Sequence, residues 1–410
     1  MKILFLKAYF QPEIAASMYL TENLIENLAA NGFEAEIHVP TPTRGVSEEI
    51  RQEYKLKKYE VLYDGKIRIY RFAMFREGSH PFIRACRYLC CNMVQFIKGL
   101  SSRNVDLIYV TSTPPTMGAL AAILKRFKKI PVVYSLQDIF PDSLISTGLA
   151  KQNSIYWKMG RLLESYTYKN LDRIIVISED SKRNIMAKGV PEDKIEVVYN
   201  WVDENAVLPI HKDDNILFEK LNLSRDEFYV VYAGNLGHAQ NIEIIINAAH
   251  QLIDHRGIKF VIFGGGQQED HYKKMAQDLK LDNIQFFPLE PYSMVSQVYS
   301  LGDVSIVSCK EGFGGSAMPS KTWSIMSAGT AVLASFDEGT DMHRIIEENN
   351  VGIFTKAGDA EGLKEAILKL YNHQDVCQEM GQRGREFILH NLTREIGTKK
   401  TIEIMKSVVR

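Results

Sequence analysis

The stretch from Glu311 to Gly329 combines a carboxylate, closely spaced glycines and a lysine in an order that suits anion binding. It reads EGFGGSAMPSKTWSIMSAG. Pro319 and Ser320 are expected to open a short helix, with Ser320 as its cap and Lys321 in its first turn. A cation there opposes the helix dipole unless an anion is bound, and free N–H groups with a lysine can hold a phosphate. The alternative is an ordinary strand–helix turn with an accidental lysine.

Two further glycine loops follow apolar strand-like runs in the same half of the chain. Gly264-Gly265-Gly266 follows the run at 260–263, and Gly234-Asn235-Leu236-Gly237 follows the run at 229–232. Glycine lets the backbone approach a ligand closely. Each loop alone is equally well explained as a simple turn, but three such loops together favour a nucleotide-type ligand in the C-terminal half.

The elements that must position these loops are the strands of a parallel sheet. Apolar runs alternate with amphipathic helical runs along the chain, which is typical of a parallel sheet covered by helices. The strand-like runs are KILFLKAY, EAEIHVP, KIRIYRF, DLIYVTS, PVVYSLQD, DRIIVIS, FYVVYAG, IKFVIFGGG, IQFFP, VSIVS, TAVLAS and VGIFT. The pattern starts anew after Asn200, so we predict an α/β fold of two Rossmann-like, doubly wound domains at 1–200 and 201–392. Ligands of such sheets bind beyond the carboxyl ends of the strands, here in a cleft between the domains.

The composition is that of a globular protein. The chain has 410 residues, of which 45% are hydrophobic and 24% charged, and this suits two domains and excludes a disordered chain. No run approaches the 18 apolar residues of a membrane-spanning helix, and the first strand lacks the features of a signal peptide. The five cysteines show no metal-binding spacing, so we expect reduced thiols and a cytoplasmic protein.

Positive charge is concentrated in one region although the net charge is −1: residues 51–131 carry 16 Lys and Arg against 5 Asp and Glu. Within it, residues 80–100 predict an amphipathic helix with Arg84, Arg87, Gln95 and Lys98 on its polar side. Its apolar side comprises Ile83, Cys86, Leu89, Cys90, Met93, Val94, Ile97 and Leu100. The apolar side either packs on the protein core or dips into an anionic bilayer. Nucleic-acid binding is not favoured, because the region lacks interleaved aromatic residues and any known module.

Taken together, these motifs resemble those of the family 4 retaining glycosyltransferases of the GT-B fold. The resemblance runs the whole length, through YFQPEIAAS, VVYSLQDIFPDS, RIIVISEDSKRNI, EVVYNWVD, YAGNLGHAQNIEIIINAA, MPSKTWSIMSAGTAVLAS and MGQRGREFILHNLTREI. The details of LQDIFPDS and PSK are most similar to L-fucosamine-type transferases of surface polysaccharide and O-antigen synthesis. The resemblance implies transfer of a sugar from a nucleoside diphosphate, with UDP favoured, to a lipid-diphosphate-linked saccharide. It also implies a C-terminal helix at 393–410 that crosses back to the N-terminal domain.

The resemblance assigns roles on the donor side. Counting back from MSAG, Ser324 and Ser316 stand where many members have two glutamates, so Glu311 is the remaining candidate to face the donor sugar as a catalytic residue. Asn235 and Gln240 stand near the family's phosphate-binding Arg and Lys, and we expect Lys321 to supply that charge instead. The predicted donor-binding residues are Gly234, Asn235, Gly264, Gly265, Gly314, Gly315, Ser316, Pro319, Ser320, Lys321 and Ser324.

On the acceptor side, Asp138 lies where relatives often have a His-Asp pair at the end of a strand. It is the predicted catalytic residue that orients or deprotonates the acceptor hydroxyl, with capping of the next turn as the alternative. The predicted acceptor-binding residues are Glu13, Ala16, Ser17, Gln137, Arg84 and Arg87. No metal or cofactor is expected, because the chain has no Asp-x-Asp sequence and no His or Cys ligand spacing.

Two other functions remain open. A nucleotide-sugar epimerase of the same fold would turn over its substrate without an acceptor. A catalytically silent subunit would bind the nucleotide sugar and activate a partner transferase, which the missing Arg, Lys and second glutamate make worth testing.

Overall fold

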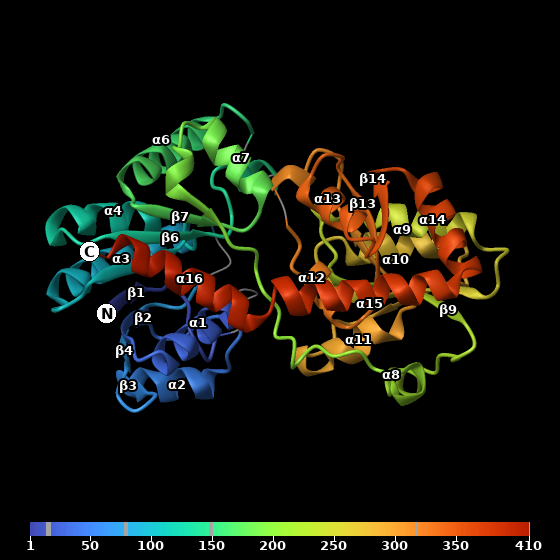
Figure 1. Cartoon of the computed structure of the whole chain (residues 1–410), viewed down its shortest axis with the longest axis horizontal. Coiled ribbons are helices and arrows are strands. Elements are labelled where there is room, and N and C mark those ends of the chain that lie inside the picture. Colours follow the sequence, from blue (N-terminus) through green and yellow to red (C-terminus); the bar gives the residue numbers. More distant parts are fainter. Residues whose placement is uncertain (14–17, 78–80, 147–150, 317, 410) are drawn as a thin grey trace. The chain divides into compact units, whose positions relative to one another are not determined.

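The computed structural model describes the whole chain except residues 14–17, 78–80, 147–150, 317 and 410 (Figure 1). The chain divides into an N-terminal unit, Met1–Tyr199 with Glu395–Arg410, and a C-terminal unit, Asn200–Arg394. Each unit is a mainly parallel sheet with helices packed on it, so the predicted doubly wound α/β architecture is confirmed. The predicted domain boundaries at 200/201 and 392/393 lie next to these divisions.

The N-terminal unit contains an eight-stranded sheet in the order β3-β4-β2-β1-β5-β6-β7-β8. Neighbouring strands are parallel except the pair of β3 and β4. The sequence does not predict β3, whose residues at the sheet edge are alternately exposed and half-buried, or β8, which has only 3 residues. The strands are β1 (Lys2–Leu6), β2 (Glu34–Pro40), β3 (Tyr59–Leu62), β4 (Ile67–Phe72), β5 (Leu107–Thr111), β6 (Val132–Leu136), β7 (Arg173–Val176) and β8 (Ile195–Val197).

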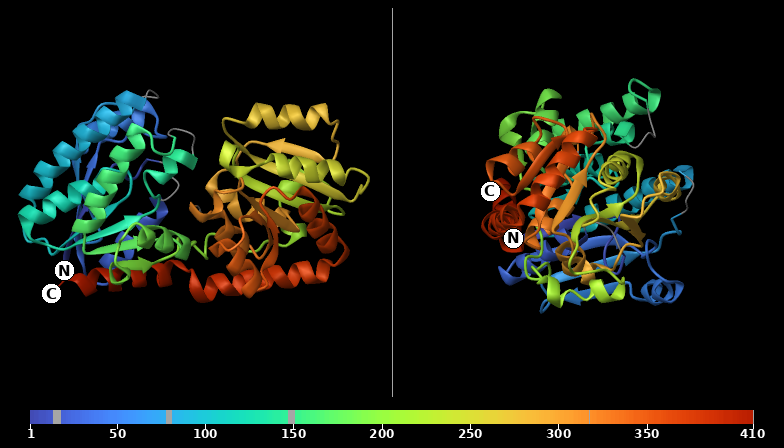
Figure 2. Two further views of the ribbon diagram at one scale, coloured as in Figure 1. Left: turned by 90° about the horizontal axis from the view of Figure 1, so that it is seen from above. Right: turned by 90° about the vertical axis from the view of Figure 1, so that its right-hand side faces the viewer.

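Three helices of the N-terminal unit, α3, α4 and α6, lie side by side (Figure 2). Their inner sides and the strands share an apolar core that includes Leu4, Val110, Leu124, Tyr134 and Tyr168. The helices of the unit are α1 (Met18–Ala30), α2 (Glu48–Leu56), α3 (Pro81–Ser101), α4 (Met117–Lys128), α5 (Asp142–Ser146), α6 (Ile155–Asn170), α7 (Glu179–Ala187) and the last helix of the chain, α16 (Arg394–Val408). In α16, the Nζ of Lys406 lies 5.1 Å from the ring centre of Phe33, which follows α1.

Helix α3 turns two residues of its predicted polar side, Arg87 and Gln95, toward the core, against the alternative in which its apolar side packs there. Arg87, Cys91 and Gln95, which are spaced four residues apart, are all fully buried against the sheet. The Arg87 guanidinium donates to the Phe75 carbonyl (3.2 Å) and to Thr43 Oγ1 (3.0 Å), and the Gln95 amide donates to the Lys7 carbonyl (2.8 Å). Two loop carbonyls and one hydroxyl thus accept hydrogen bonds from side chains that periodicity alone would place in solvent, and the apolar residues Leu89, Met93 and Ile97 are exposed.

The C-terminal unit contains a six-stranded parallel sheet in the order β11-β10-β9-β12-β13-β14. The strands are β9 (Phe228–Asn235), β10 (Ile258–Gly265), β11 (Ile284–Phe287), β12 (Val304–Ser308), β13 (Ala331–Phe336) and β14 (Gly352–Lys356), all of which the sequence predicts. The helices are α8 (Leu217–Lys220), α9 (Glu243–Gln251), α10 (Glu269–Asp278), α11 (Val295–Leu301), α12 (Lys321–Ser327), α13 (Asp341–Glu348), α14 (Ala360–Asn372) and α15 (Gln374–Asn391).

One arginine joins three segments of this unit that are far apart in the sequence. Arg385 of α15 donates to the carbonyls of Glu204 (2.9 Å), Val207 (2.9 Å) and Ser327 (3.0 Å). Glu204 and Val207 belong to the segment that follows the passage from one unit to the other, and Ser327 is the last residue of α12. The short helix α12 is therefore fastened at its carboxyl end.

Candidate functional site

The three predicted glycine loops follow three neighbouring strands, β10, β9 and β12. The parallel register of β9 and β10 pairs Gly234 with Gly264 and Asn235 with Gly265. Because all six strands run in one direction, the loops meet at the carboxyl edge of the sheet. The structure thus brings together the donor-side residues that the sequence places in separate motifs.

The glycines at this edge are required by contacts between the loops themselves. A Cβ atom on Gly264 would lie 2.3 Å from the Gly234 carbonyl oxygen, and one on Gly266 would lie 2.6 Å from the Leu236 carbonyl oxygen. The Leu236 amide donates to the Gly265 carbonyl (3.0 Å). The simple-turn interpretation therefore accounts for these glycines, and they carry no argument for a ligand by themselves.

Lys321 is the unusual residue of the site. Its Nζ lies 3.9 Å from the ring centre of Tyr232 in β9, and a Cβ atom on Gly234 would come within 2.7 Å of it. Burial lowers the pKa of the Lys321 ammonium to about 7. Among the residues that the structure describes, no carboxylate oxygen lies within 4.0 Å of Lys321 Nζ, which is the limit for an ion pair. A buried ammonium without an internal counter-ion is costly unless an anion binds beside it.

The predicted cap of α12 is wrong. Ser320 occupies the N-cap position with helical angles, φ −60° and ψ −20°, and its side chain makes no capping hydrogen bond. The helix has only 7 residues, so its dipole is weak. Pro319 precedes it, and Ser324 follows Lys321 by one turn. An anion at this site would consequently be held by the Lys321 ammonium and not by the helix end.

The loop between β12 and α12 is held by a residue that sequence reasoning missed. Asp337, directly after β13, accepts hydrogen bonds from the amides of Gly312 (3.0 Å) and Gly314 (2.7 Å). Glu311, Gly315 and Ser316 are exposed on the same loop. An aspartate one residue beyond a buried strand is the available signal, but nothing in the sequence says which loop it would fasten.

We expect Asp337→Ala to free this loop without unfolding the unit. The amide of the exposed Gly312 and that of the buried Gly314 would lose a charged acceptor, which corresponds to a loss of about 2 kcal/mol. Hydrogen exchange measured by mass spectrometry should become faster in peptides covering Gly312 and Gly314 and stay unchanged in β9. Unchanged exchange at the two glycines would show that Asp337 does not hold the loop.

The positions that correspond to the family's phosphate-binding Arg and Lys contact each other. Asn235 Nδ2 donates to Gln240 Oε1 at 3.3 Å. Between them in the chain, His238 Nε2 lies 3.5 Å from Nζ of Lys310, whose backbone amide donates to the Ala239 carbonyl. Lys310 is exposed and follows β12, so it is a second cation at this edge that sequence reasoning did not select.

Asp138 lies at the carboxyl end of β6 in the N-terminal unit. Ser112 Oγ accepts hydrogen bonds from the backbone amides of Gln137 (3.1 Å) and Asp138 (3.3 Å). These two bonds fix the turn. The Asp138 side chain reaches solvent, yet it is desolvated enough that its pKa is raised. A raised pKa makes a carboxylate a stronger base, which suits the predicted role.

The other predicted acceptor residues have different surroundings. Glu13 is buried, and its carboxylate accepts hydrogen bonds from the amides of Thr43 (2.7 Å) and Arg44 (3.0 Å). It therefore joins the loop after β1 to the loop after β2. Desolvation raises the Glu13 pKa, and these hydrogen bonds oppose the rise. Arg87 is fully buried in α3 and does not reach solvent, whereas Arg84 is exposed and pairs with Glu77 at 3.2 Å. Ala16 and Ser17 lie outside the described residues.

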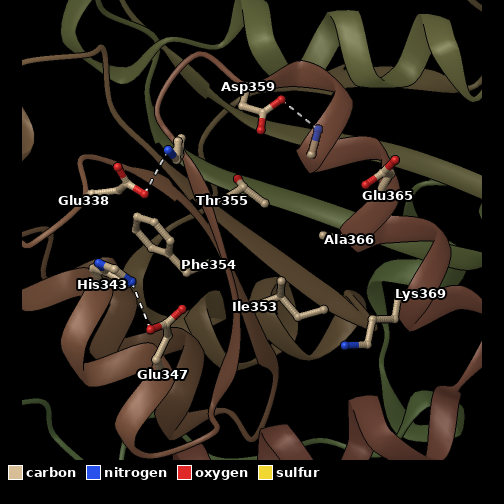
Figure 3. Close-up of a pocket in the computed structure, with 12 residues that line it drawn as sticks. Glu338, His343, Glu347, Ile353, Phe354, Thr355, Asp359, Glu365, Ala366 and Lys369 are labelled. Carbon is tan, nitrogen blue, oxygen red and sulfur yellow. Dashed lines mark hydrogen bonds and ion pairs between the residues drawn. The ribbon is translucent and has the colours of Figure 1, made fainter.

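The pocket in Figure 3 is a separate feature of the C-terminal unit. It measures about 410 Å³ and is lined by β14, α13 and α14. The His343 ring stacks on Phe354 with centroids 4.0 Å apart and pairs with Glu347 at 3.0 Å. It shares no residue with the glycine loops or Lys321, so it is not the candidate site.

The described residues lack two other kinds of feature. They contain no group of three or more His, Cys, Asp and Glu side chains arranged to hold a metal ion. Within the same residues, no helix is long and apolar enough to cross a membrane.

Comparison with known families gives one match for each unit. Residues 19–206 match the model described as Glycosyltransferase Family 4, and residues 213–387 match the model described as Glycosyl transferases group 1. Among curated relatives, the putative colanic acid biosynthesis glycosyl transferase WcaI of Escherichia coli K12 is 24% identical, over 97% of this chain and 100% of its own length. The probable glycosyltransferase WbjE of Pseudomonas aeruginosa is 25% identical, over 73% of this chain and 74% of its own length.

Solved structures of the same fold cover nearly the whole chain. Sucrose-phosphate synthase from Thermosynechococcus elongatus matches with a TM-score of 0.77 at 15% identity, over 99% of this chain and 98% of the other. HepE of Anabaena in complex with UDP-glucose matches with a TM-score of 0.72 at 15% identity, over 99% and 100%. Since a glycosyltransferase domain model matches each of its two units, the chain belongs to the family 4 glycosyltransferases of the GT-B fold.

Proposed function

We propose that this glycosyltransferase moves a sugar from UDP to a lipid-diphosphate-linked saccharide, with retention of the anomeric configuration, in surface polysaccharide synthesis such as that of capsule or O-antigen. The observation that carries the proposal is Lys321, whose desolvated ammonium lies beside the Gly234 loop and pairs with no carboxylate of the described residues. The relatives support the pathway class, because WcaI is named for colanic acid biosynthesis. The structures of HepE with UDP and UDP-glucose support the donor.

In the proposed reaction, the bond between the anomeric carbon and the diphosphate oxygen breaks while the acceptor hydroxyl oxygen bonds to that carbon. Lys321 stabilises the charge that grows on the departing diphosphate, with Lys310 as a nearby exposed cation. The hydroxyl proton passes to the diphosphate oxygen on the same face of the sugar, and Asp138 orients the hydroxyl. Glu311, exposed on the loop that Asp337 fastens, is the proposed contact to the sugar.

The sugar is proposed to be a hexose or an N-acetylaminosugar of the fucosamine type. Because a lipid-linked acceptor lies in a membrane, we further propose that the enzyme works in the cytoplasm, peripherally bound to the inner face of the cell membrane. No metal or other cofactor is part of the proposed reaction, since Lys321 and backbone amides supply the positive charge.

Calorimetric titration of the purified protein with UDP, GDP, ADP and dTDP tests the donor site. We expect selective binding of UDP, which Lys321→Ala weakens by at least about tenfold because one charged contact to the diphosphate is lost. Lys310→Ala serves as the matched control for a lysine at the same sheet edge and should have the smaller effect. Selective binding of another nucleotide would overturn the UDP assignment.

The titration, followed by an assay of UDP-sugar turnover with and without an acceptor, separates the rival functions. Binding of no nucleotide would contradict the donor site altogether. Nucleotide-sugar binding without transfer or slow hydrolysis would favour a silent subunit. Conversion of the nucleotide sugar without any acceptor would favour an epimerase.

A further inference from the structure

The free edge of the C-terminal sheet borders the pocket in Figure 3. Strand β14 ends the sheet order, so β13 is its only neighbour there. The Phe354 ring stacks on His343 of α13, whereas Ile353 packs against the apolar core to which α14 contributes. Because successive residues of a strand point to opposite faces, α13 and α14 are the two walls of a groove along the edge of β14. We call it the β14 groove, and its lining includes residues 353–356, His343, Glu347, Glu365 and Lys369.

Part of the backbone of β14 is unpaired along this edge. The Val332 amide of β13 donates to the Val351 carbonyl, so Val351 faces β13. Residues of a parallel strand face the neighbouring strand alternately, and Gly352 and Phe354 therefore face away from β13. Among the described residues, none forms a hydrogen bond with the amide or the carbonyl of either residue. A strand edge with free amides and carbonyls is a template for pairing with another strand.

The walls of the groove carry charges of both signs. On α13, His343 pairs with Glu347 of the same helix at 3.0 Å. On α14, Glu365 and Lys369 are also four residues apart, and both are exposed (Figure 3). Neither of them forms an ion pair with any residue that the structure describes. The α14 wall thus offers a carboxylate and an ammonium to the charges of another molecule.

We infer that the β14 groove binds the β14 groove of a second copy of this chain. A two-fold axis through the groove sets the two β14 edges antiparallel, with Phe354 opposite the partner's Phe354 and Gly352 opposite the partner's Lys356. Residues that face away from β13 in one copy then meet residues that face away from it in the other. Their free amides and carbonyls pair, and the two six-stranded sheets become continuous.

The charges of α14 fit this two-fold arrangement. The axis that reverses the strands also reverses the helices, so the α14 helices of the two copies lie antiparallel beside each other. Glu365 then approaches the partner's Lys369, and the same contact recurs across the axis, as a self-complementary interface requires. A foreign peptide is the less favoured occupant, because an acid and a base four residues apart present no single sign of charge to it. The inference does not depend on the proposed donor or acceptor.

Charge reversal with reciprocal rescue tests the contact in the full-length protein. Glu365→Lys alone sets like positive charges against each other across the axis, and Lys369→Glu alone does the same with negative charges. The double variant restores opposite charges with their places exchanged, and a mixture of the two single variants restores them in a heterodimer. Lys274→Glu on α10 is the matched control, since it is exposed in the same unit and outside the groove. All three positions are exposed, so the variants should melt like the wild type.

A proline tests the pairing of the strands separately from that of the helices. Lys356→Pro removes an amide that faces away from β13, so it breaks a bond across the axis and none within the sheet. The Lys356 carbonyl, which accepts a hydrogen bond from the Asp359 amide (3.1 Å), is kept. Lys356→Ala is the control, because it removes the same side chain and its exposed pair with Glu338 but keeps the amide.

Sedimentation equilibrium from about 1 to about 100 μM protein measures the association. We expect the wild type to dimerise in this range and to dissociate more readily at high salt. Each single reversal and Lys356→Pro should weaken the dimer at least about tenfold. The double reversal, the mixed single variants, Lys356→Ala and Lys274→Glu should stay within about threefold of the wild type.

Three outcomes would overturn the inference. A wild type that is monomeric at about 100 μM would leave the edge to an extended segment of another protein. Single reversals that dimerise like the wild type, or a double reversal as weak as they are, would contradict the contact of Glu365 with the partner's Lys369. Full association of Lys356→Pro would exclude the pairing of the strands. No nucleotide is present in the assay, so its outcome is independent of the nucleotide titration.

Discussion

Replacing Lys321 by Met should make the free protein more stable while weakening its binding of a nucleoside diphosphate. Burial holds the Lys321 pKa at about 7, against 10.5 for an ordinary lysine. At pH 7 the folded chain must therefore either keep a buried charge or release a proton that the unfolded chain would hold. Methionine fills a similar volume without this penalty, and we expect the variant to gain about 2 kcal/mol in free energy of unfolding.

The dependence of this gain on pH has a definite sign. Between pH 7 and 10.5 the unfolded chain binds more protons at Lys321 than the folded chain, so wild-type stability from this residue rises with pH. The advantage of the variant should be largest at and below pH 7 and disappear as pH approaches 10. Lys7 is also buried, with its pKa lowered to about 8, but it is common to both proteins and cancels in the difference.

Urea denaturation at several pH values from 6 to 10 measures this difference. Lys310→Met is the matched control, because Lys310 is exposed at the same sheet edge and its replacement should change stability by less than about 0.5 kcal/mol. A Lys321→Met protein that is less stable than the wild type at pH 7 would mean that the lysine has a strong internal partner. An anion would then not be needed beside Gly234 to offset the charge of Lys321.

Replacing Gly381 by Ala should destabilise the C-terminal unit by about 2–3 kcal/mol. In α15, a Cβ atom at this position would lie 2.0 Å from the carbonyl oxygen of Gly329, which follows α12. That neighbour is backbone and cannot rotate away, so α15 and the α12–β13 turn must separate. The gain of about 1 kcal/mol that alanine brings to a helix interior does not offset overpacking of this kind.

Gly384→Ala in the same helix is the matched control. Its Cβ atom would lie 3.3 Å from the Met326 side chain, a contact that a small shift relieves, so this variant should stay within about 1 kcal/mol of the wild type. Both can be followed by tryptophan fluorescence in urea, since the ring of Trp323 in α12 stacks on that of Phe387 in α15 at 6.4 Å. Equal stability of the two variants would show that Gly381 does not set the distance between the helices.

Local patterns were sufficient to predict most of the fold. Every strand of the C-terminal unit was predicted because each is a short apolar run bounded by turn residues, as the sequence from Phe228 to Gly234 illustrates. Strand β3 was not predicted because its residues are partly exposed at the sheet edge. Strand β8 was not predicted because three residues are too few to form a pattern. Both strands form by pairing with a neighbouring strand, and the sequence of a single segment does not encode that pairing.

The orientation of α3 and the surroundings of the site depend on distant residues, and so they were beyond sequence reasoning. Periodicity separates the apolar residues Leu89, Met93 and Ile97 from Arg87, but only the Phe75 carbonyl and Thr43 determine that Arg87 points inward. The fastening of the Gly312 loop by Asp337 is likewise a contact between separate loops. The sequence singles out Lys321 by its place in the first turn of a helix, whereas its environment against Tyr232 follows from the packing of β9 beside α12.

The hydrogen bonds of Arg385 hold the carboxyl end of α12 in place, while Lys321, its first residue, lies at its amino end. The carbonyl of its last residue, Ser327, accepts a hydrogen bond from Arg385 of α15, which also donates to the carbonyls of Glu204 and Val207. A helix of 7 residues spans only about 10 Å and has little length over which to bend. A force exerted by a ligand on the lysine would therefore be transmitted to residues 204–207, a few residues after the chain passes from one unit to the other.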